Sequence, residues 1–100
     1  MDKVTLKVMD LVEGTSTNIN AVPLFLEMDK VIIANKVIVL SLKNAPALSS
    51  SFLNSSIGEL VTKHGFNTLK GRLKIVDYTP VMADLIKNYL ENLKEGVNYK

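Results

Sequence analysis

The sequence predicts a small α/β domain with a largely parallel sheet of three to four strands and about three helices, in β-α-β-α-β-α order. One observation is the unbroken apolar run at residues 37–40, which is typical of a strand buried on both faces of a parallel sheet. Another is the helix-period apolar patterns that precede and follow this run. Short connections favour right-handed crossovers, with the helices covering one sheet face more than the other.

Residues 4–9 predict the first strand. Apolar and polar side chains alternate along them, as in a strand that is half-buried at a sheet edge. Leu11 and Val12 are candidates to lengthen this strand. The turn-rich stretch at residues 13–18 holds Gly, Ser, Thr and Asn, and it ends the element.

The first helix is predicted over residues 21–33. Asn18 or Asn20 is expected to cap it, with Pro23 in its first turn, where a missing N–H costs little. A strand that begins within residues 31–33 is the alternative. The side chains expected on the solvent side of the helix are Glu27, Asp29 and Lys30.

A second helix follows the central strand. A loop with Asn44 and Pro46 leads from the strand to a serine cluster at residues 49–51, where the helical pattern begins. We expect this helix to end at His64 and Gly65, a favourable helix terminus. The apolar residues that recur at helical spacing are Leu53, Ile57, Leu60 and Val61.

The C-terminal part predicts a short strand at residues 72–77 and a final helix. Thr79 and Pro80 are a strong helix start, since they offer a hydroxyl cap and a proline at the first helical position. The amphipathic pattern over residues 82–93 is the clearest in the chain. Lys94 and Gly96 are expected to close the helix, and a frayed tail is expected after them, from Val97 to Lys100.

Composition limits the classes of function. One hundred residues with 47% hydrophobic and 22% charged side chains suit one folded domain. The net charge is +2, and the twelve basic residues are scattered, which argues against a nucleic-acid partner. The absence of cysteine excludes disulfides and thiolate metal sites. The N-terminus does not resemble a signal peptide, and residues 31–42 are too short to cross a bilayer, so we expect a cytoplasmic protein with no membrane contact.

Residue patterns of catalysis are missing from the sequence. His64, the single histidine, is expected to cap a helix or lie on the surface, because a helix C-terminus favours a cation. There is no G-x-S-x-G elbow, no phosphate-binding glycine loop and no metal-ligand spacing. Asp77 and Asp84 form no recognisable acid–base pair. We therefore expect no catalytic residue, no cofactor and no metal, and a protein that is not an enzyme.

The serine cluster Ser49, Ser50 and Ser51 has two interpretations. In the structural one, a hydroxyl caps the helix by accepting a hydrogen bond from a backbone N–H, and the other two serines belong to the loop. In the functional one, a serine accepts a phosphate, which a helix N-terminus favours through its dipole and its N–H groups. The residues alone leave both open.

The next turn of this helix is small and uncharged. Asn54, Ser55 and Ser56 stand where a solvated helix usually carries Lys and Glu, which favours an interaction surface. Gly58 lies inside the helix, where glycine costs roughly 1 kcal/mol relative to alanine. Close packing is the favoured explanation for this glycine, and the close approach of a partner is the alternative.

Three short stretches carry a family resemblance: S-S-F at residues 50–52, G-E-L at residues 58–60, and Gly65. Together with the apolar strand before them and the later L-K-I-V-D-Y-T-P, they resemble a small bacterial STAS-like family. That family is related to the anti-sigma-factor antagonists and to the cytoplasmic domain of sulfate transporters. The resemblance is strongest over residues 37–93 and implies a mixed sheet with helices mainly on one side. We expect residues 1–100 to form a single STAS-like domain.

The resemblance implies a non-catalytic regulator that switches partners. In anti-sigma-factor antagonists, a serine or threonine at the N-terminus of the helix after the central strand is phosphorylated by a partner with a histidine-kinase-type ATP-binding fold. The phosphate then breaks the complex. Ser50 and Ser51 match the position of this phosphoacceptor. The expected partner contacts are Ser49, Asn54 and Ser55.

The chain departs from the family pattern at two places. Family members usually carry an acidic residue on the central strand, where this chain has Ser41. They also tend to have an acidic pair after S-S-F, where this chain has Asn54 and Ser55. The carboxylates that the family would place at these positions are therefore replaced by neutral groups.

Two other functions stay open. One is a homodimeric scaffold without switching, which would associate through the neutral helix face or through the exposed edge strand at residues 4–9. The other is a domain that binds a small ligand at the C-terminal ends of the strands, as α/β sheets often do.

Overall fold

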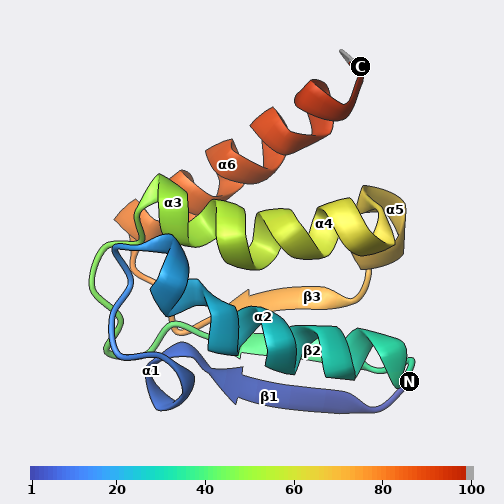
Figure 1. The fold of residues 1–100 in the computed structure, drawn as a ribbon, viewed down its shortest axis with the longest axis horizontal. Coiled ribbons are helices and arrows are strands. Elements are labelled where there is room, and N and C mark those ends of the chain that lie inside the picture. Colours follow the sequence, from blue (N-terminus) through green and yellow to red (C-terminus); the bar gives the residue numbers. More distant parts are fainter. Residues whose placement is uncertain (99–100) are drawn as a thin grey trace.

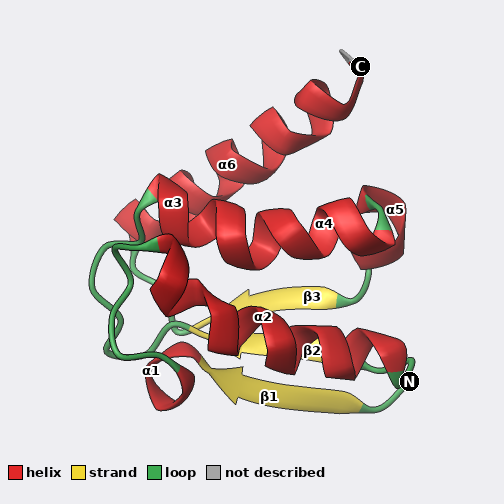
Figure 2. Ribbon diagram, viewed as in Figure 1, coloured by secondary structure: helices red, strands yellow, loops and turns green. Residues whose placement is uncertain are grey.

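The computed structural model describes residues 1–98, with side chains through residue 93. A sheet forms one layer, and the helices pack mainly against one of its faces (Figures 1 and 2). The elements in chain order are β1 (Lys3–Lys7), α1 (Val8–Leu11), α2 (Asn18–Ile33), β2 (Val37–Ser41), α3 (Ser50–Leu53), the π-helical turn η1 (Asn54–Gly58), α4 (Glu59–His64), α5 (Phe66–Leu69), β3 (Leu73–Val76) and α6 (Pro80–Asn98).

The described strands form a sheet in the order β1-β2-β3, and both strand pairs are parallel. Ile38 and Leu40 of the central strand β2 are fully buried in the core beneath the helices. Val37 lies on the opposite face, since side chains alternate along a strand, and it is buried as well. The prediction of a strand buried on both faces is therefore confirmed.

The α/β class and the alternation of strands with helices are confirmed. The mixed sheet that the family resemblance implied is wrong for the described strands, because both of their pairings are parallel. The strands predicted at residues 37–40 and 72–77 are β2 and β3, and each predicted boundary lies within one residue of the observed one. The helices lie mainly on one face, as the short connections indicated (Figure 2).

The first strand is shorter than predicted. β1 ends at Lys7, and α1 begins at Val8. The helical turn places Val8 and Val12 on one side, where both are buried, and the Val12 N–H donates to the Val8 carbonyl at 3.1 Å. The predicted extension of the strand to Leu11 and Val12 is therefore wrong. A helical turn buries Val8 and Val12 instead.

Helix α2 begins earlier than expected. Thr17 is its N-cap, and the Thr17 hydroxyl accepts a hydrogen bond from the Asn20 N–H at 3.2 Å, so the caps predicted at Asn18 and Asn20 are wrong. The early start also places Pro23 inside the helix rather than in its first turn. The helix continues to Ile33, which excludes the alternative strand at residues 31–33.

Residues 50–64 form one continuous helical segment, made of α3, η1 and α4. We call it the switch helix, after the phosphoacceptor role that the family resemblance implies for its serines. Its middle turn is π-helical, a form that occurs mostly as a single turn inside an α-helix. Within this turn the buried hydroxyl of Ser56 donates to the Phe52 carbonyl at 2.7 Å, a bond to the residue four positions earlier that often bends a helix. The segment ends at His64 as predicted, followed by Gly65 with a φ of 90°.

The last helix starts as the sequence predicts. Pro80 is its first residue, and the Thr79 hydroxyl accepts a hydrogen bond from the Met82 N–H at 3.2 Å. The helix does not close at Lys94 or Gly96, because its backbone continues to Asn98. The expected frayed tail lies partly within this helix, and its last two positions, 99 and 100, lie outside the described residues.

Candidate functional site

The candidate site lies at the N-terminus of the switch helix, where the loop after β2 arrives. Ser49 is the N-cap, and its hydroxyl accepts a hydrogen bond from the Phe52 N–H at 3.0 Å. The Ser49 N–H donates to the Thr15 carbonyl at 3.0 Å, and the buried Thr15 hydroxyl donates to the Ala47 carbonyl at 2.9 Å. The start of the helix is thus fixed by the loop that follows α1.

The other two serines of the cluster are presented to solvent. Ser50 and Ser51 are exposed on the first turn, and neither hydroxyl has a hydrogen-bond partner among the described residues. Of the two interpretations of the cluster, capping therefore belongs to Ser49 alone. The structure leaves the hydroxyls of Ser50 and Ser51 available for chemistry or for contact.

Ser50 also borders a groove between the switch helix and α6. The groove has a volume of about 230 Å³, and the lining side chains within residues 1–93 are all uncharged. Apolar surface from Leu85, which is partly exposed, alternates there with amide groups from Asn88 and Asn92. The lining residues are Leu48, Ser50, Leu53, Leu85, Asn88, Tyr89 and Asn92.

The neutral face of the switch helix is partly covered by α6. Asn54 is exposed, but its Oδ1 accepts a hydrogen bond from the Tyr89 hydroxyl at 2.8 Å. Burial raises the pKa of Tyr89, so the phenol stays protonated and able to donate. Ser55 is half-buried, and Ser56 is fully buried with its hydroxyl turned back to the helix. Of this trio, only Asn54 is exposed to solvent.

Gly58 is required for the approach of α6. A Cβ atom built on Gly58 would lie 2.5 Å from the Tyr89 hydroxyl oxygen and 3.4 Å from the Leu53 carbonyl oxygen. Real side chains do not come this close, so the ring of Tyr89 occupies space that only glycine leaves open. Packing, which was the favoured explanation of this glycine, accounts for it.

A carboxylate lies beside Ser41 although the strand itself carries none. Ser41 ends β2, is buried, and donates a hydrogen bond to Oδ2 of Asp77 at 2.6 Å. Asp77 directly follows the parallel neighbour β3 and has a φ of 57°. The Ser41 hydroxyl also accepts from the Lys43 N–H at 3.3 Å. The acid expected on the central strand thus comes from the end of the next strand.

A second cluster of charged groups joins α2 to the end of the switch helix. Asp29 is buried, which corrects its expected place on the solvent side of α2. Its two carboxylate oxygens lie 2.7 Å from Nζ of Lys63 and 2.6 Å from Nε2 of His64. The hydrogen bond from Lys63, followed by that with His64, lowers the pKa of Asp29 despite its burial. This carboxylate thus remains charged at neutral pH.

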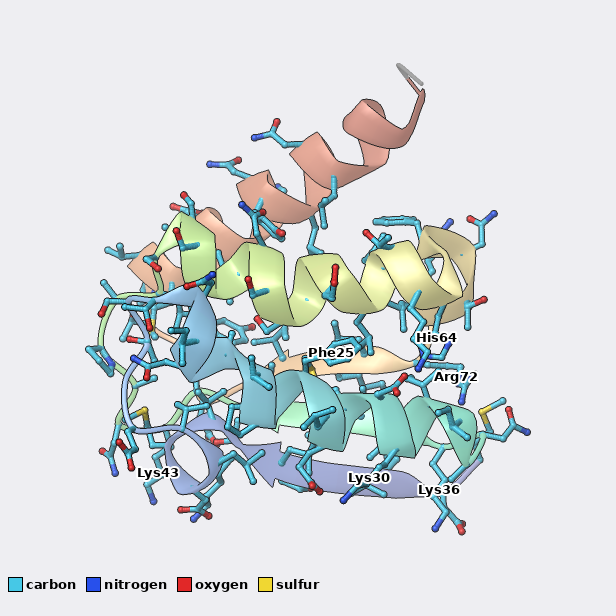
Figure 3. All side chains as sticks on the ribbon, in the orientation of Figure 1. Phe25, Lys30, Lys36, Lys43, His64 and Arg72 are labelled. Carbon is cyan, nitrogen blue, oxygen red and sulfur yellow. The ribbon has the colours of Figure 1, made fainter. Side chains whose placement is uncertain are left out.

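Arg72 anchors the same end of the molecule. Its guanidinium donates to the carbonyl of Ile32 at 2.9 Å and to that of Lys36 at 3.1 Å, and so satisfies carbonyls near the C-terminus of α2. Figure 3 shows His64 and Arg72 gathered at this end, near Lys36. His64 therefore belongs, with Lys63 and Asp29, to a hydrogen-bonded network that joins α4 to α2.

A family model described as a STAS-like domain of unknown function matches residues 20–82, more than half of the chain. The chain belongs to this STAS-like family. No curated protein and no solved structure matches it. The family assignment confirms the resemblance seen in the sequence and the α/β fold, and it leaves the function of the family open.

The limits of the family match divide the groove of this STAS-like domain. The wall that carries Leu48, Ser50 and Leu53 lies inside the match. The opposite wall, from Leu85 to Asn92 of α6, follows the matched residues. The serine cluster therefore stands on the part that the family model describes, and α6 adds the surface next to it.

Two findings concern other classes of site. Within the described residues, no group of three or more His, Cys, Asp or Glu side chains is placed to hold a metal ion. No helix in the described part of this STAS-like domain is long and apolar enough to cross a membrane.

Proposed function

We propose that this STAS-like domain is a non-catalytic protein-interaction module that switches partners. Its partner is a protein with a histidine-kinase-type ATP-binding fold, and its switch is phosphorylation of Ser50 or Ser51. The observation that carries the proposal is an exposed serine hydroxyl at the start of a long helix, on the border of an uncharged groove. The family assignment is compatible with an interaction module of this kind.

A phosphate at this position changes the surface strongly. It adds about −1.5 to −2 charges and three acceptor oxygens at neutral pH. Among the side chains that the structure describes, none that lines the groove beside Ser50 carries a charge to compensate them. The helix N-terminus tolerates the phosphate through its dipole, while a partner seated on the neutral groove loses its complementarity. Phosphorylation is thus expected to release the partner without unfolding the domain.

Ser50 is the better acceptor of the two. It is exposed and borders the groove, whereas Ser51 is exposed but lies outside the groove lining. Ser49 is unsuited, because its oxygen caps the helix. Ser49, Asn54 and Ser55 keep the role of partner contacts in this proposal, with Asn54 presented by its bond to Tyr89.

The test is a pull-down from a lysate of the source organism, read by mass spectrometry. Three immobilised proteins are compared: the wild type, Ser50→Ala/Ser51→Ala, and Ser50→Asp/Ser51→Asp. A kinase-like ATPase is expected with the wild type and with the alanine variant, and at least tenfold less of it with the aspartate variant. Incubating the recovered partner with ATP is expected to phosphorylate the wild type and to leave the alanine variant unmodified.

Two results would contradict the proposal. One is equal recovery of the partner by the wild type and the aspartate variant, which would mean binding without this switch. The other is recovery of no ATP-binding partner by any of the three proteins. A thermal melt of each variant provides the control, because exposed serines without described partners are expected to change stability little.

A further inference from the structure

Helix α2 carries an apolar stripe on the side turned away from the core. Four of its large hydrophobic side chains are strongly exposed: Ile19 by 77%, Ile33 by 65%, Leu26 by 51% and Val22 by 48%. At 3.6 residues per turn, these four positions fall within an arc of about 60°. The arc faces away from the buried side, which carries Ala21, Leu24, Met28, Val31 and Ile32.

A helix on the surface of a monomeric domain is normally polar on its outer side, and a helix that is apolar all round is normally buried. Contiguous exposed apolar surface on a folded domain commonly marks an interaction site. α2 lies on the surface of the helical layer, with the sheet behind it (Figure 1). The outer side of α2 thus requires a cover that the described chain does not provide.

The spacing of the stripe indicates what covers it. Ile19 and Ile33 lie seven residues before and seven residues after Leu26, so these three positions are symmetric about Leu26, while the counterpart of Val22 is Lys30. A second α2 that runs antiparallel over the first then places Leu26 against Leu26 and Ile19 against Ile33. This self-complementarity is the condition for a two-fold symmetric interface between identical chains.

The charges beside the stripe permit this arrangement. Asp29 is occupied by Lys63 and His64 of its own chain. Lys30 forms an ion pair with Glu27 at 2.9 Å, and its long stem lies beside the stripe. In the antiparallel register, Lys30 would face Val22 of the second copy, so no pair of like charges meets at the interface.

We infer that α2 is a homodimer interface, in which two copies of this chain pack their α2 helices antiparallel with Leu26 on the two-fold axis. The interface differs from the neutral switch-helix face and from the β1 edge, the two surfaces that the sequence suggested for self-association. None of the stripe residues lines the groove at Ser50, so we expect the dimer to be independent of the proposed partner switch. One helix pair is smaller than a standard interface of about 800 Å² per partner, and we therefore expect micromolar affinity.

Sedimentation velocity of the purified chain, over concentrations from about 1 to several hundred micromolar, tests the dimer. The wild type is expected to shift from monomer to dimer within this range. Leu26→Glu places two carboxylates at the axis and is expected to raise the dissociation constant at least about a hundredfold. The matched control is Val81→Glu at an exposed apolar position of α6, which is expected to leave the dissociation constant unchanged.

The register is tested separately, because the chain contains no cysteine of its own. Leu26→Cys is expected to link to itself with a short bismaleimide. Ile19→Cys and Ile33→Cys are expected to link when mixed, and not when present singly, since identical positions then lie about 20 Å apart. Circular-dichroism melts establish that each variant is folded.

The inference is overturned by a wild type that stays monomeric throughout, or by a dimer that Leu26→Glu leaves intact in a folded protein. Self-linking of Ile19→Cys alone overturns the antiparallel register. The dimer is also expected to persist in Ser50→Asp/Ser51→Asp, so failure of the partner switch and failure of the dimer give different results. Dissociation of the dimer by the aspartate pair would overturn the assignment to α2.

Discussion

α2 and the switch helix pack together over the sheet, and their outer sides differ in polarity and in cover. α2 exposes large apolar residues, with Leu26 at their centre. The switch helix instead presents a small neutral surface, and Tyr89 of α6 lies directly against its Gly58. Both segments contribute a buried side to the same core (Figure 1). The difference shows that burial in the core determines which residues the inner side of each helix carries. The residues on the outer side depend on which element packs against that helix.

Asp29 illustrates the same lesson from the inner side. A carboxylate is expected in solvent, yet the adjoining helix brings Lys63 and His64 to it, so burial is compensated. Ile19, on the same helix, is a large apolar residue, yet 77% of it is exposed. Polarity alone assigns these residues wrongly, because the partners that reverse the assignment are distant in the sequence.

The largest effect is expected when the link between the two helices is broken. Asp29→Asn removes the charge that holds Lys63 and His64, and it is expected to lower the free energy of unfolding at neutral pH by about 2 kcal/mol. The control on the outer side of α2 is Glu27→Gln, which breaks the exposed pair with Lys30 and is expected to change stability by less than about 0.5 kcal/mol. Urea unfolding measures both.

The pH dependence of the free energy of unfolding tests the same interaction of Asp29 with Lys63 and His64. The pKa of Asp29 lies below its ordinary value of 3.8 in the folded protein. The stability it contributes is therefore fully present above about pH 4 and is lost as the pH falls through the lowered pKa. The difference in free energy of unfolding between the wild type and Asp29→Asn is expected to narrow as the pH falls below about 4. A gap that is constant down to about pH 2 would mean that the carboxylate charge is not involved.

An intermediate effect is expected where α6 covers the switch helix. Gly58→Ala drives a methyl group into the Tyr89 hydroxyl and is expected to destabilise the protein by about 1 kcal/mol. In a Tyr89→Ala background the same change is expected to stabilise by roughly 1 kcal/mol, because only the helix propensity of alanine remains. A double-mutant cycle in urea reports this reversal of sign. Equal effects in the two backgrounds would show that α6 does not rest on Gly58.

Local sequence signals predict most of this fold. The apolar run of β2, the hydroxyl and proline at the start of α6 and the glycine after His64 are local signals, and each element lies where they indicate. The errors come from signals that compete locally. Thr17 and Asn18 are equally suited to cap α2, and Val8 with Val12 satisfies a strand pattern as well as a helical turn.

The candidate site was only partly accessible from sequence. The serine cluster and Gly58 are local features and were found. The bond between Ser41 and Asp77 spans 36 residues. Ser41 ends β2 and Asp77 directly follows the parallel neighbour β3, so their meeting at one sheet edge could have been inferred. The network of Asp29 with Lys63 and His64 depends on how two helices pack, for which the sequence carries no pairing rule.

The last comparison concerns the N-termini of the two helices, where the smallest effect is expected at Ser51. Thr17 and Ser49 each accept a hydrogen bond from the N–H three residues later, so Thr17→Ala and Ser49→Ala are each expected to cost about 1 kcal/mol. Ser51→Ala, two residues from the cap, is expected to stay within about 0.5 kcal/mol of the wild type. Thermal and urea unfolding measure the three changes. A loss of stability in Ser51→Ala as large as that in Ser49→Ala would mean that the Ser51 hydroxyl stabilises the helix. Ser51 would then no longer be a residue that can be modified without destabilising the fold.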